Sequence, residues 1–129
     1  MKRERISVQE IAEPPDPKMG SQCIRSGKFL FISGQIAHLN GQLIGRGDPV
    51  EQCRQTLRNI QSLLSAAGGS LDNVVSMDIF LSDIRYRPAA IQARAEFFNA
   101  PGPSATVVGG VDLAYDDLLV EISAIAILD

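Results

Sequence analysis

Tryptophan is absent from this 129-residue sequence, histidine occurs once and cysteine twice, and aromatic residues make up only 5% of the chain. Cys23 and Cys53 stand apart rather than in a Cys-x-x-Cys pair, a pattern that does not favour a zinc site. The single histidine, His38, has no serine or cysteine partner in a motif that would indicate a catalytic triad. We therefore expect neither a metal ion nor a cofactor.

Positive charge is also scarce. The chain has 12 lysines and arginines against 15 acidic residues, which gives a net charge of −3. Such a chain has no basic field to hold a phosphate backbone, so we do not expect nucleic acid as a partner. The densest basic cluster, residues 2–5, is typical of a solvated terminus.

Long apolar runs are missing as well. No run reaches the roughly 18 residues that a membrane span requires, and the first ten residues lack the apolar centre of a secretory signal. We expect a cytoplasmic protein that does not bind membranes. Its 45% apolar and 21% charged residues are typical of globular proteins, and its length indicates a single domain over residues 1–129.

The clearest pattern that is present predicts a helix over residues 49–67. Asp48 is a suitable N-cap, Pro49 suits the first helical position, and Glu51 has the spacing of a capping box. Gly68-Gly69 is a typical helix end. Apolar residues recur between these ends at three- and four-residue steps: Val50, Cys53, Leu57, Ile60, Leu64 and Ala67.

Several other segments have the composition of β-strands. They are residues 28–37, 42–45, 73–83, 104–110 and 118–128. Asn40-Gly41 favours a tight turn between the first two. In the third, Val75 and every second residue after it should form the buried face. The last strand is apolar almost throughout, which predicts a central place in the sheet.

A second helix is predicted over residues 88–98, with Ile91, Ala95 and Phe98 on its inner side. Two helices on one face of a mixed sheet would cover the apolar stripes, which indicates an α+β fold. The strand segments 29–36 and 118–127 are nevertheless too apolar on both sides to face water. A chain of this length has no third layer, so we predict a closed homo-oligomer that covers the second face.

Two polar interruptions of apolar strands are candidate site residues. Glu121 lies among apolar neighbours, and because a buried unpaired carboxylate is costly, it either points into a polar cleft or pairs with an arginine. Ser33-Gly34 indicates a bulge or the close approach of a ligand. A close contact between strands at a subunit interface would also explain this glycine.

Two further residues have a plainer alternative. His38 follows a strand and precedes a turn, where a solvated histidine is the usual state. Arg94 lies on the second predicted helix, where it either faces solvent or reaches a ligand.

Taken together, several stretches resemble the reactive-intermediate deaminase family, also called the RidA or YjgF family and described as endoribonuclease L-PSP-like. They are Ser-Gly-Gln at 33–35, Gln-Thr-x-x-Asn-Ile at 55–60, Gly-Pro-Ser-Ala-Thr at 102–106 and Val-Glu-Ile at 120–122. The resemblance runs from about Ser21 to the C-terminus. It implies a chorismate-mutase-like (YjgF-like) α+β fold, a homotrimer, and ligand clefts between adjacent subunits.

The resemblance also implies an activity. Members of the family hydrolyse enamines and imines such as 2-aminoacrylate, releasing ammonia and a 2-keto acid. An arginine in a Pro-x-Arg-Ser/Thr motif grips the substrate carboxylate. Here the motif reads Pro103-Ser104-Ala105-Thr106, so Ala105 replaces the arginine and Thr106 keeps the hydroxyl position.

Other family positions are retained. Ser33 and Gly34 match residues that line the family's cleft, and Glu121 matches the acid that positions the attacking water. Arg94 occupies a tyrosine position of the family. We hypothesise that Arg94 supplies the missing cation, binds a small carboxylate ligand, and pairs with Glu121 when no ligand is bound.

Three functions follow from this pattern. The first is a diverged deaminase or hydrolase for a small enamine, imine or related metabolite, with little activity on 2-aminoacrylate because a charge-assisted arginine contact is lost. The second is a non-catalytic trimer that binds a metabolite or a partner protein. The third, an endoribonuclease or translation inhibitor, is not favoured by the acidic net charge.

Overall fold

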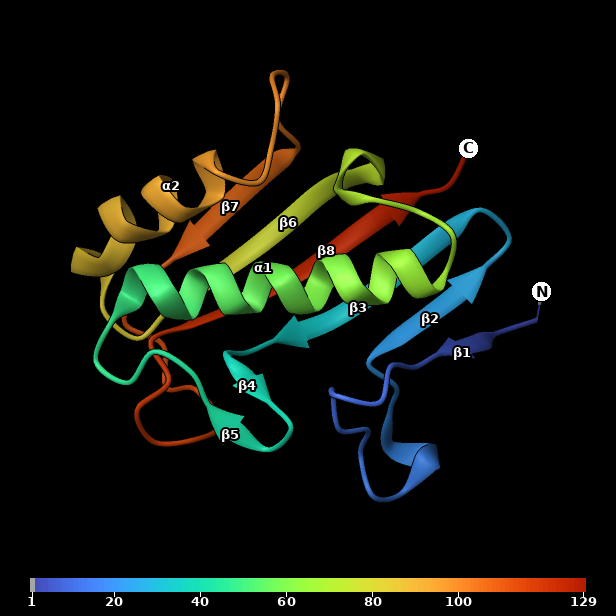
Figure 1. Ribbon diagram of the computed structural model, residues 1–129, viewed down its shortest axis with the longest axis horizontal. Helices are drawn as coiled ribbons and strands as arrows, with labels where there is room; N and C mark the ends of the chain where they lie inside the picture. The colour runs from blue at the N-terminus through green and yellow to red at the C-terminus, as the bar shows by residue number, and fades with distance from the viewer. Residues whose placement is uncertain (1) are drawn as a thin grey trace.

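The protein is built on a six-stranded sheet (Figure 1). The computed structural model describes residues 2–129 of the chain. In spatial order the strands are β1 (Glu4–Ile6), β2 (Cys23–Ser26), β3 (Phe29–Gln35), β8 (Val120–Ile127), β6 (Val74–Leu81) and β7 (Ser104–Val108). Neighbouring strands are antiparallel except for β6 and β7, which run parallel. The most apolar strand, β8, lies inside the sheet as predicted.

A short hairpin stands beside this sheet. It consists of β4 (His38–Leu39) and β5 (Gln42–Leu43). Its turn, Asn40-Gly41, has φ values of 50° and 77°. Positive φ at both positions is what a two-residue turn between antiparallel strands requires, so the predicted turn is confirmed.

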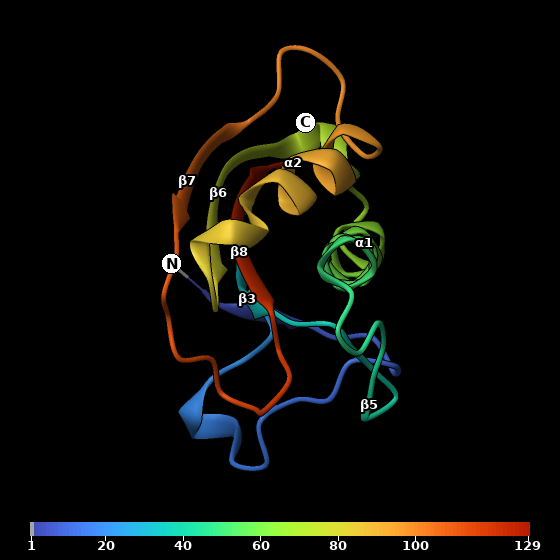
Figure 2. The same cartoon turned by 90° about the vertical axis from the view of Figure 1, so that its left-hand side faces the viewer.

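Two helices cover one face of the sheet. α1 (Pro49–Ala66) and α2 (Arg87–Ala95) pack against each other on the same side, as the edge-on view shows (Figure 2). The predicted α+β class, a mixed sheet with two helices on one face, is confirmed. Short 3-10 helices occur at Pro17–Met19, Leu71–Asn73 and Ile84–Tyr86. Among residues 2–129, no helix is long and apolar enough to cross a membrane.

The N-terminal end of α1 forms where the sequence predicts it. The Asp48 carboxylate accepts hydrogen bonds from the backbone N–H groups of Val50 and Glu51, each at 3.1 Å. Glu51 does not complete a capping box. Its carboxylate instead pairs with Arg54 and Arg58, each at 3.2 Å, and these hydrogen bonds hold the pKa of Glu51 below its ordinary value.

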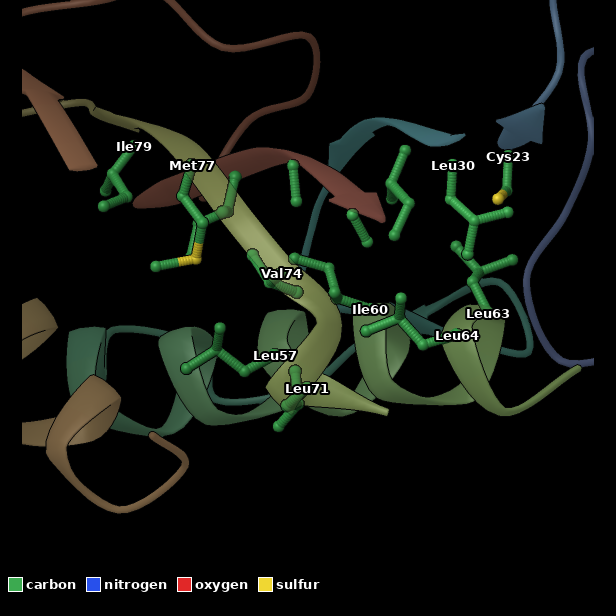
Figure 3. Packing of buried hydrophobic residues seen from close by; sticks show 14 of the residues in the cluster. Cys23, Leu30, Leu57, Ile60, Leu63, Leu64, Leu71, Val74, Met77 and Ile79 are labelled. Carbon is green, nitrogen blue, oxygen red and sulfur yellow. The ribbon is translucent and has the colours of Figure 1, made fainter. Parts of the chain in front are cut away.

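The hydrophobic core lies between α1 and the sheet (Figure 3). Leu57, Ile60 and Leu64 of α1 are fully buried. They meet buried side chains of the central strands, among them Leu30, Ile79 and Ile122. Full burial of one such side chain stabilises a fold by about 1.5–3 kcal/mol, so this layer is the main source of stability.

α2 turns a different face to the core than the sequence predicts. Its buried residues are Ala90 and Ala93, while Ile91 is 43% exposed and Ala95 is exposed as well. The reason is the close packing of the two helices, since the Cys53 Sγ lies 3.9 Å from the Ala90 carbonyl oxygen. Only small side chains fit at this contact. Phe98, beyond the end of the helix, packs against the core as predicted.

The start of β6 also differs from the prediction. Val75 was expected inside but is 44% exposed, and Val74 is buried in its place. The register between β6 and β8 shifts between Val74 and Ser76, and such an irregularity reverses which side chain faces the core. From Met77 onward the predicted faces are confirmed.

The sheet face opposite the helices carries exposed apolar side chains. Phe29 and Phe31 are each 46% exposed, and their stacked rings lie 6.2 Å apart. Ile125 and Ile127 on the neighbouring β8 are 37% and 38% exposed. Within residues 2–129 no helix covers this face (Figure 2). It is therefore available to another subunit.

Candidate functional site

A bulge in β3 brings its two small residues next to β8. The register between these strands shifts between Ile32 and Gln35, so Ser33 and Gly34 together lie opposite Ser123. One extra residue on one strand is the defining feature of a bulge. The bulge predicted at Ser33-Gly34 is confirmed.

The glycine of this bulge makes room for Glu121. A Cβ atom at Gly34 would lie 2.5 Å from Glu121 Oε2 and 2.6 Å from its Cδ, far inside van der Waals contact. The close approach that the glycine indicated is therefore made by a side chain of the neighbouring strand. Any larger residue at this position would have to displace the carboxylate.

Glu121 and Gly34 line a cavity of about 250 Å³. The other walls come from residues 10–12, from the β4–β5 hairpin, and from the segment between β7 and β8. Polar side chains from these segments converge on one space, although they are far apart in the sequence.

Glu121 is half-buried in this cavity, and no residue among 2–129 forms a hydrogen bond or an ion pair with its carboxylate. Burial raises the pKa of Glu121 above its ordinary value of 4.5. Of the two alternatives open from the sequence, the polar cleft is the one present within this chain. A poorly solvated carboxylate of this kind is suited to accept a proton.

Ser33 is fixed in place by two glutamines. Its Oγ donates to Gln22 Oε1 at 3.0 Å, while Gln35 Nε2 donates to the same oxygen at 2.7 Å and to the Ser33 carbonyl at 3.1 Å. Ser33 also lines a groove of about 310 Å³ on the outer sheet face, together with Asp78 and Ser123. This network holds the bulge in its shape.

His38 does not lie in bulk solvent, so that prediction is wrong. It is half-buried, and its ring centroid lies 5.1 Å from that of Tyr115, with 34° between the ring planes. Both residues line the same cavity as Glu121. Sequence reasoning missed this pair because no local motif joins a residue of the hairpin to one between β7 and β8.

A row of buried polar residues on α1 holds the His38 side of the cavity. Asn59 Nδ2 donates to the carbonyl oxygens of Ile36 and His38, both at 2.9 Å. The Asn59 side-chain oxygen accepts a hydrogen bond from Gln55 Nε2 at 2.9 Å. Both polar residues belong to the Gln-Thr-x-x-Asn-Ile stretch that the sequence singles out.

Gln52, nearer the start of α1, holds the Tyr115 side. Its Nε2 donates to the carbonyl oxygens of Asp117 at 2.9 Å and Gly45 at 3.2 Å, and its Oε1 accepts from the Leu119 N–H at 2.9 Å. An ion pair between Arg46 and Asp117 joins the same two segments. One helix therefore positions both segments that carry the His38–Tyr115 wall of the cavity.

Arg94 and Ala105 lie on the helix side of the sheet, away from Glu121. Ala105 is in register with the buried Met77 of β6. Arg94 lines a separate pocket of about 310 Å³ together with Met77 and Pro103. The hypothesised pair of Arg94 with Glu121 is therefore not formed within one protomer.

Thr106 lies on the same sheet face as Glu121. It is exposed and in register with Asp78, which in turn pairs with Ser123 of β8. The structure thus brings Ser33, Gly34 and Glu121 together, and it places Thr106 two strands away from β8 on their side of the sheet.

The two cysteines offer no reactive thiol to this site. Both are buried, and burial is the main cause that raises the pKa of Cys23 and of Cys53 to about 11. A thiol with such a pKa stays protonated near neutral pH. Within residues 2–129 no group of three or more histidine, cysteine, aspartate or glutamate side chains is arranged to hold a metal ion.

Comparison with known proteins identifies the family. Residues 14–128 match the family described as Endoribonuclease L-PSP. A RutC family protein of Pyrococcus horikoshii is 36% identical over 126 residues, which cover 96% of this chain and 97% of that protein. The chain belongs to this family, the RidA family. Within it, a 2-iminobutanoate/2-iminopropanoate deaminase of Dermatophagoides farinae is 27% identical over 125 residues, covering 96% of this chain and 95% of that protein.

A solved structure supports the fold of this RidA-family chain. RidA from the Antarctic bacterium Psychrobacter superimposes with a TM-score of 0.84 at 26% identity, covering 97% of this chain and 99% of that one. The family and the fold inferred from the sequence are confirmed. Within the described residues 2–129, no lysine or arginine lines the cavity beside the Glu121 acid.

Proposed function

We propose that the protein is a RidA-family hydrolase that removes ammonia from a small imine or enamine at Glu121. The observation that carries the proposal is the half-buried Glu121 carboxylate, unpaired within residues 2–129 and lying against Gly34 in a cavity of about 250 Å³. A relative named as a 2-iminobutanoate/2-iminopropanoate deaminase supports the reaction class.

The reaction adds water to the imine carbon. Glu121 accepts a proton from the water as its oxygen attacks, and the imine nitrogen takes a proton as the C=N bond becomes single. The carbinolamine then expels ammonia and forms the carbonyl group, so one water is consumed overall. An enamine first takes a proton on carbon to become the imine. Burial raises the pKa of Glu121, and this supports its role as the base.

We propose a homotrimer whose adjacent subunits complete the cleft. The exposed apolar face over β3 and β8 supports such an assembly. Ser33 and Thr106 face the same side and are proposed ligand-binding residues along with Gly34. Arg94 is retained in that role only as a contribution from a neighbouring subunit, because α2 and Glu121 lie on opposite sides of the sheet.

The test is release of ammonia from imines made in the cuvette by amine or amino-acid oxidases. We expect the protein to accelerate hydrolysis of the imine of cyclopentylamine, and Glu121→Gln to lose roughly 100-fold or more of that rate, the range for a general base. Glu4→Gln on the edge strand β1 is the matched control and should keep the rate. No acceleration by the wild-type protein would refute the proposal.

Ala105 sets a second expectation for the same assay. Turnover of 2-aminoacrylate should be weak because position 105 carries no arginine to grip its carboxylate. Ala105 and Glu121 of one protomer lie on opposite sides of the sheet, so Ala105→Arg should raise this turnover through the cleft that a neighbouring subunit completes. Loss of a desolvated charge pair costs on the order of 2–5 kcal/mol, so the difference from an arginine-bearing relative should be tenfold or more. Equal rates of 2-aminoacrylate turnover in this protein and in an arginine-bearing relative would show that another group binds the substrate carboxylate.

The other functions considered from the sequence have less support. The name of the matching family mentions an endoribonuclease, but a net charge of −3 provides no field for an RNA backbone. A non-catalytic binding protein would bind small ligands at Glu121 without any ammonia release, so the assay above separates it from the proposed hydrolase.

A further inference from the structure

We infer that the Glu121 cavity selects a small cationic nitrogen compound, an amine or a protonated imine, with the rings of His38 and Tyr115 as one wall and the Glu121 carboxylate as its charge partner. This inference rests on the proposed function only in placing the ligand at Glu121, and it names the class of substrate.

The charge of the cavity is the first argument. As far as residues 2–129 show, its lining includes two acids, Glu10 and Glu121, and no lysine or arginine. The nearby Arg46 is already paired with Asp117. An anionic ligand would meet a poorly solvated carboxylate with no cation of the same protomer to compensate, whereas a cation would relieve the cost of burying that carboxylate.

The polar groups that remain after internal pairing are the second argument. Gln35 Nε2 is committed to Gln22 and to the Ser33 carbonyl, and both Asn59 contacts go to backbone carbonyls. These side-chain donors are therefore not free to hold a carboxylate. Glu121 accepts no hydrogen bond from residues 2–129 and is partly shielded from water, so its carboxylate is available to a ligand N–H group.

The aromatic wall is the third argument. Tyr115 and His38 lean on each other with centroids 5.1 Å apart and line the cavity together with Glu121. A cation over the face of a tyrosine ring is attracted by its quadrupole. Tyr115 is 60% exposed, so its ring is accessible to a ligand that enters the cavity.

The walls are held in place without a ligand. Asn59 forms a hydrogen bond with the His38 backbone. Gln52 forms hydrogen bonds with the backbone of Asp117 and Leu119, which follow Tyr115 in the chain. Gln52 and Asn59 are 0% and 3% exposed, so these hydrogen bonds are shielded from water. A ligand therefore meets a preorganised site and does not have to order it.

Three ring compounds of one size test the inference by binding. They are cyclopentylamine, cyclopentanol and cyclopentanecarboxylate, titrated against the purified full-length protein at pH 8 by ligand-observed NMR. We expect the amine to bind about tenfold more tightly than the alcohol, the effect of one charge-assisted hydrogen bond, and the carboxylate to bind most weakly. A carboxylate that binds as tightly as the amine would overturn the inference.

Variants assign the preference to residues. Glu121→Gln should remove the advantage of the amine over the alcohol, and Glu4→Gln, with the same change of charge far from the cavity, should keep it. Tyr115→Ala should weaken amine binding by about threefold or more, while Tyr115→Phe keeps it. An amine preference that survives in Glu121→Gln, or no effect of Tyr115→Ala, would contradict the proposed contacts.

The binding result and the proposed hydrolysis can fail separately. Glu121-dependent amine binding without ammonia release would leave the inference standing and remove the hydrolase. Ammonia release without a preference for the amine would leave the proposed hydrolase standing and overturn the inference about the ligand.

Discussion

At the scale of single residues, the contact between Gly34 and Glu121 is the feature with the clearest consequence. The absence of one methyl group on β3 allows a carboxylate to lie against the backbone of the bulge. The position of this acid, and with it the proposed base, depends on a residue that has no side chain of its own.

Gly34→Ala tests this contact. The new Cβ would meet the Glu121 side chain at 2.5 Å, and because a side chain can move, we expect a folded protein with a displaced carboxylate. Misplacement by about an ångström can cost roughly 100-fold in rate, so imine hydrolysis should fall by that order while the melting temperature changes little. Unchanged hydrolysis would mean that the position of Glu121 is not critical.

A second prediction at this scale concerns pH. Burial raises the pKa of Glu121 above 4.5, so the folded protein binds the proton more tightly than the unfolded chain does. Stability from this group is full below the ordinary pKa and is lost as pH rises through the raised pKa. Glu121→Gln, which does not titrate, should therefore gain melting temperature relative to wild type between pH 4 and pH 7.5. A difference that is constant with pH would contradict the shift.

At the scale of elements, α1 has two roles on one surface. Its apolar stripe fills the core, and its buried polar residues Gln52 and Asn59 form hydrogen bonds with the segments that wall the cavity. The cavity is therefore tied to the most stable part of the fold. Its walls are loops and short strands, which would move more freely without these hydrogen bonds.

Gln52→Ala tests the polar role of α1. The substitution leaves the Leu119 N–H and two carbonyl oxygens without their partner, at a cost of about 1–3 kcal/mol for an unsatisfied buried group. We expect denaturant unfolding to show this loss and amine binding to weaken with it. Gln61→Ala, at an exposed position of the same helix, is the control and should change stability by less than about 0.5 kcal/mol. Equal effects of the two substitutions would argue against a special role of Gln52.

At the scale of the whole molecule, the uncovered sheet face supports the proposed homotrimer. Phe29, Phe31, Ile125 and Ile127 form a contiguous apolar surface opposite the helices. Soluble monomers rarely leave such a patch in water, and closed symmetry is the usual way to cover it.

Phe31→Glu tests the proposed trimer. A charge in the middle of this face should be incompatible with its burial, so the variant should elute as a smaller species in size-exclusion chromatography with light scattering. Phe31→Leu keeps an apolar side chain and should remain trimeric. A wild-type protein that is a stable monomer at micromolar concentration would refute the assembly itself.

Much of the architecture was determined by the sequence on its own, because the signals act over a few residues. Asp48, Pro49 and the apolar steps after them begin and orient α1, and the chain leaves it through Gly68 with a φ of +83°. Asn40-Gly41 makes the hairpin turn, and the Ser33-Gly34 interruption marks the bulge. These features depend on local backbone preferences and on periodicity, both of which can be read without a partner.

The remaining features depend on which distant segments of the chain meet, and local sequence patterns do not show this. The close packing of α2 on α1 selects Ala90 and Ala93 as the buried residues, and the irregularity in β6 exchanges Val74 for Val75. His38 lines the cavity because its ring contacts Tyr115 and its carbonyl oxygen accepts a hydrogen bond from Asn59, and both residues belong to other elements. A contact between side chains far apart in the chain is set by the path of the backbone, and no spacing in the sequence encodes it.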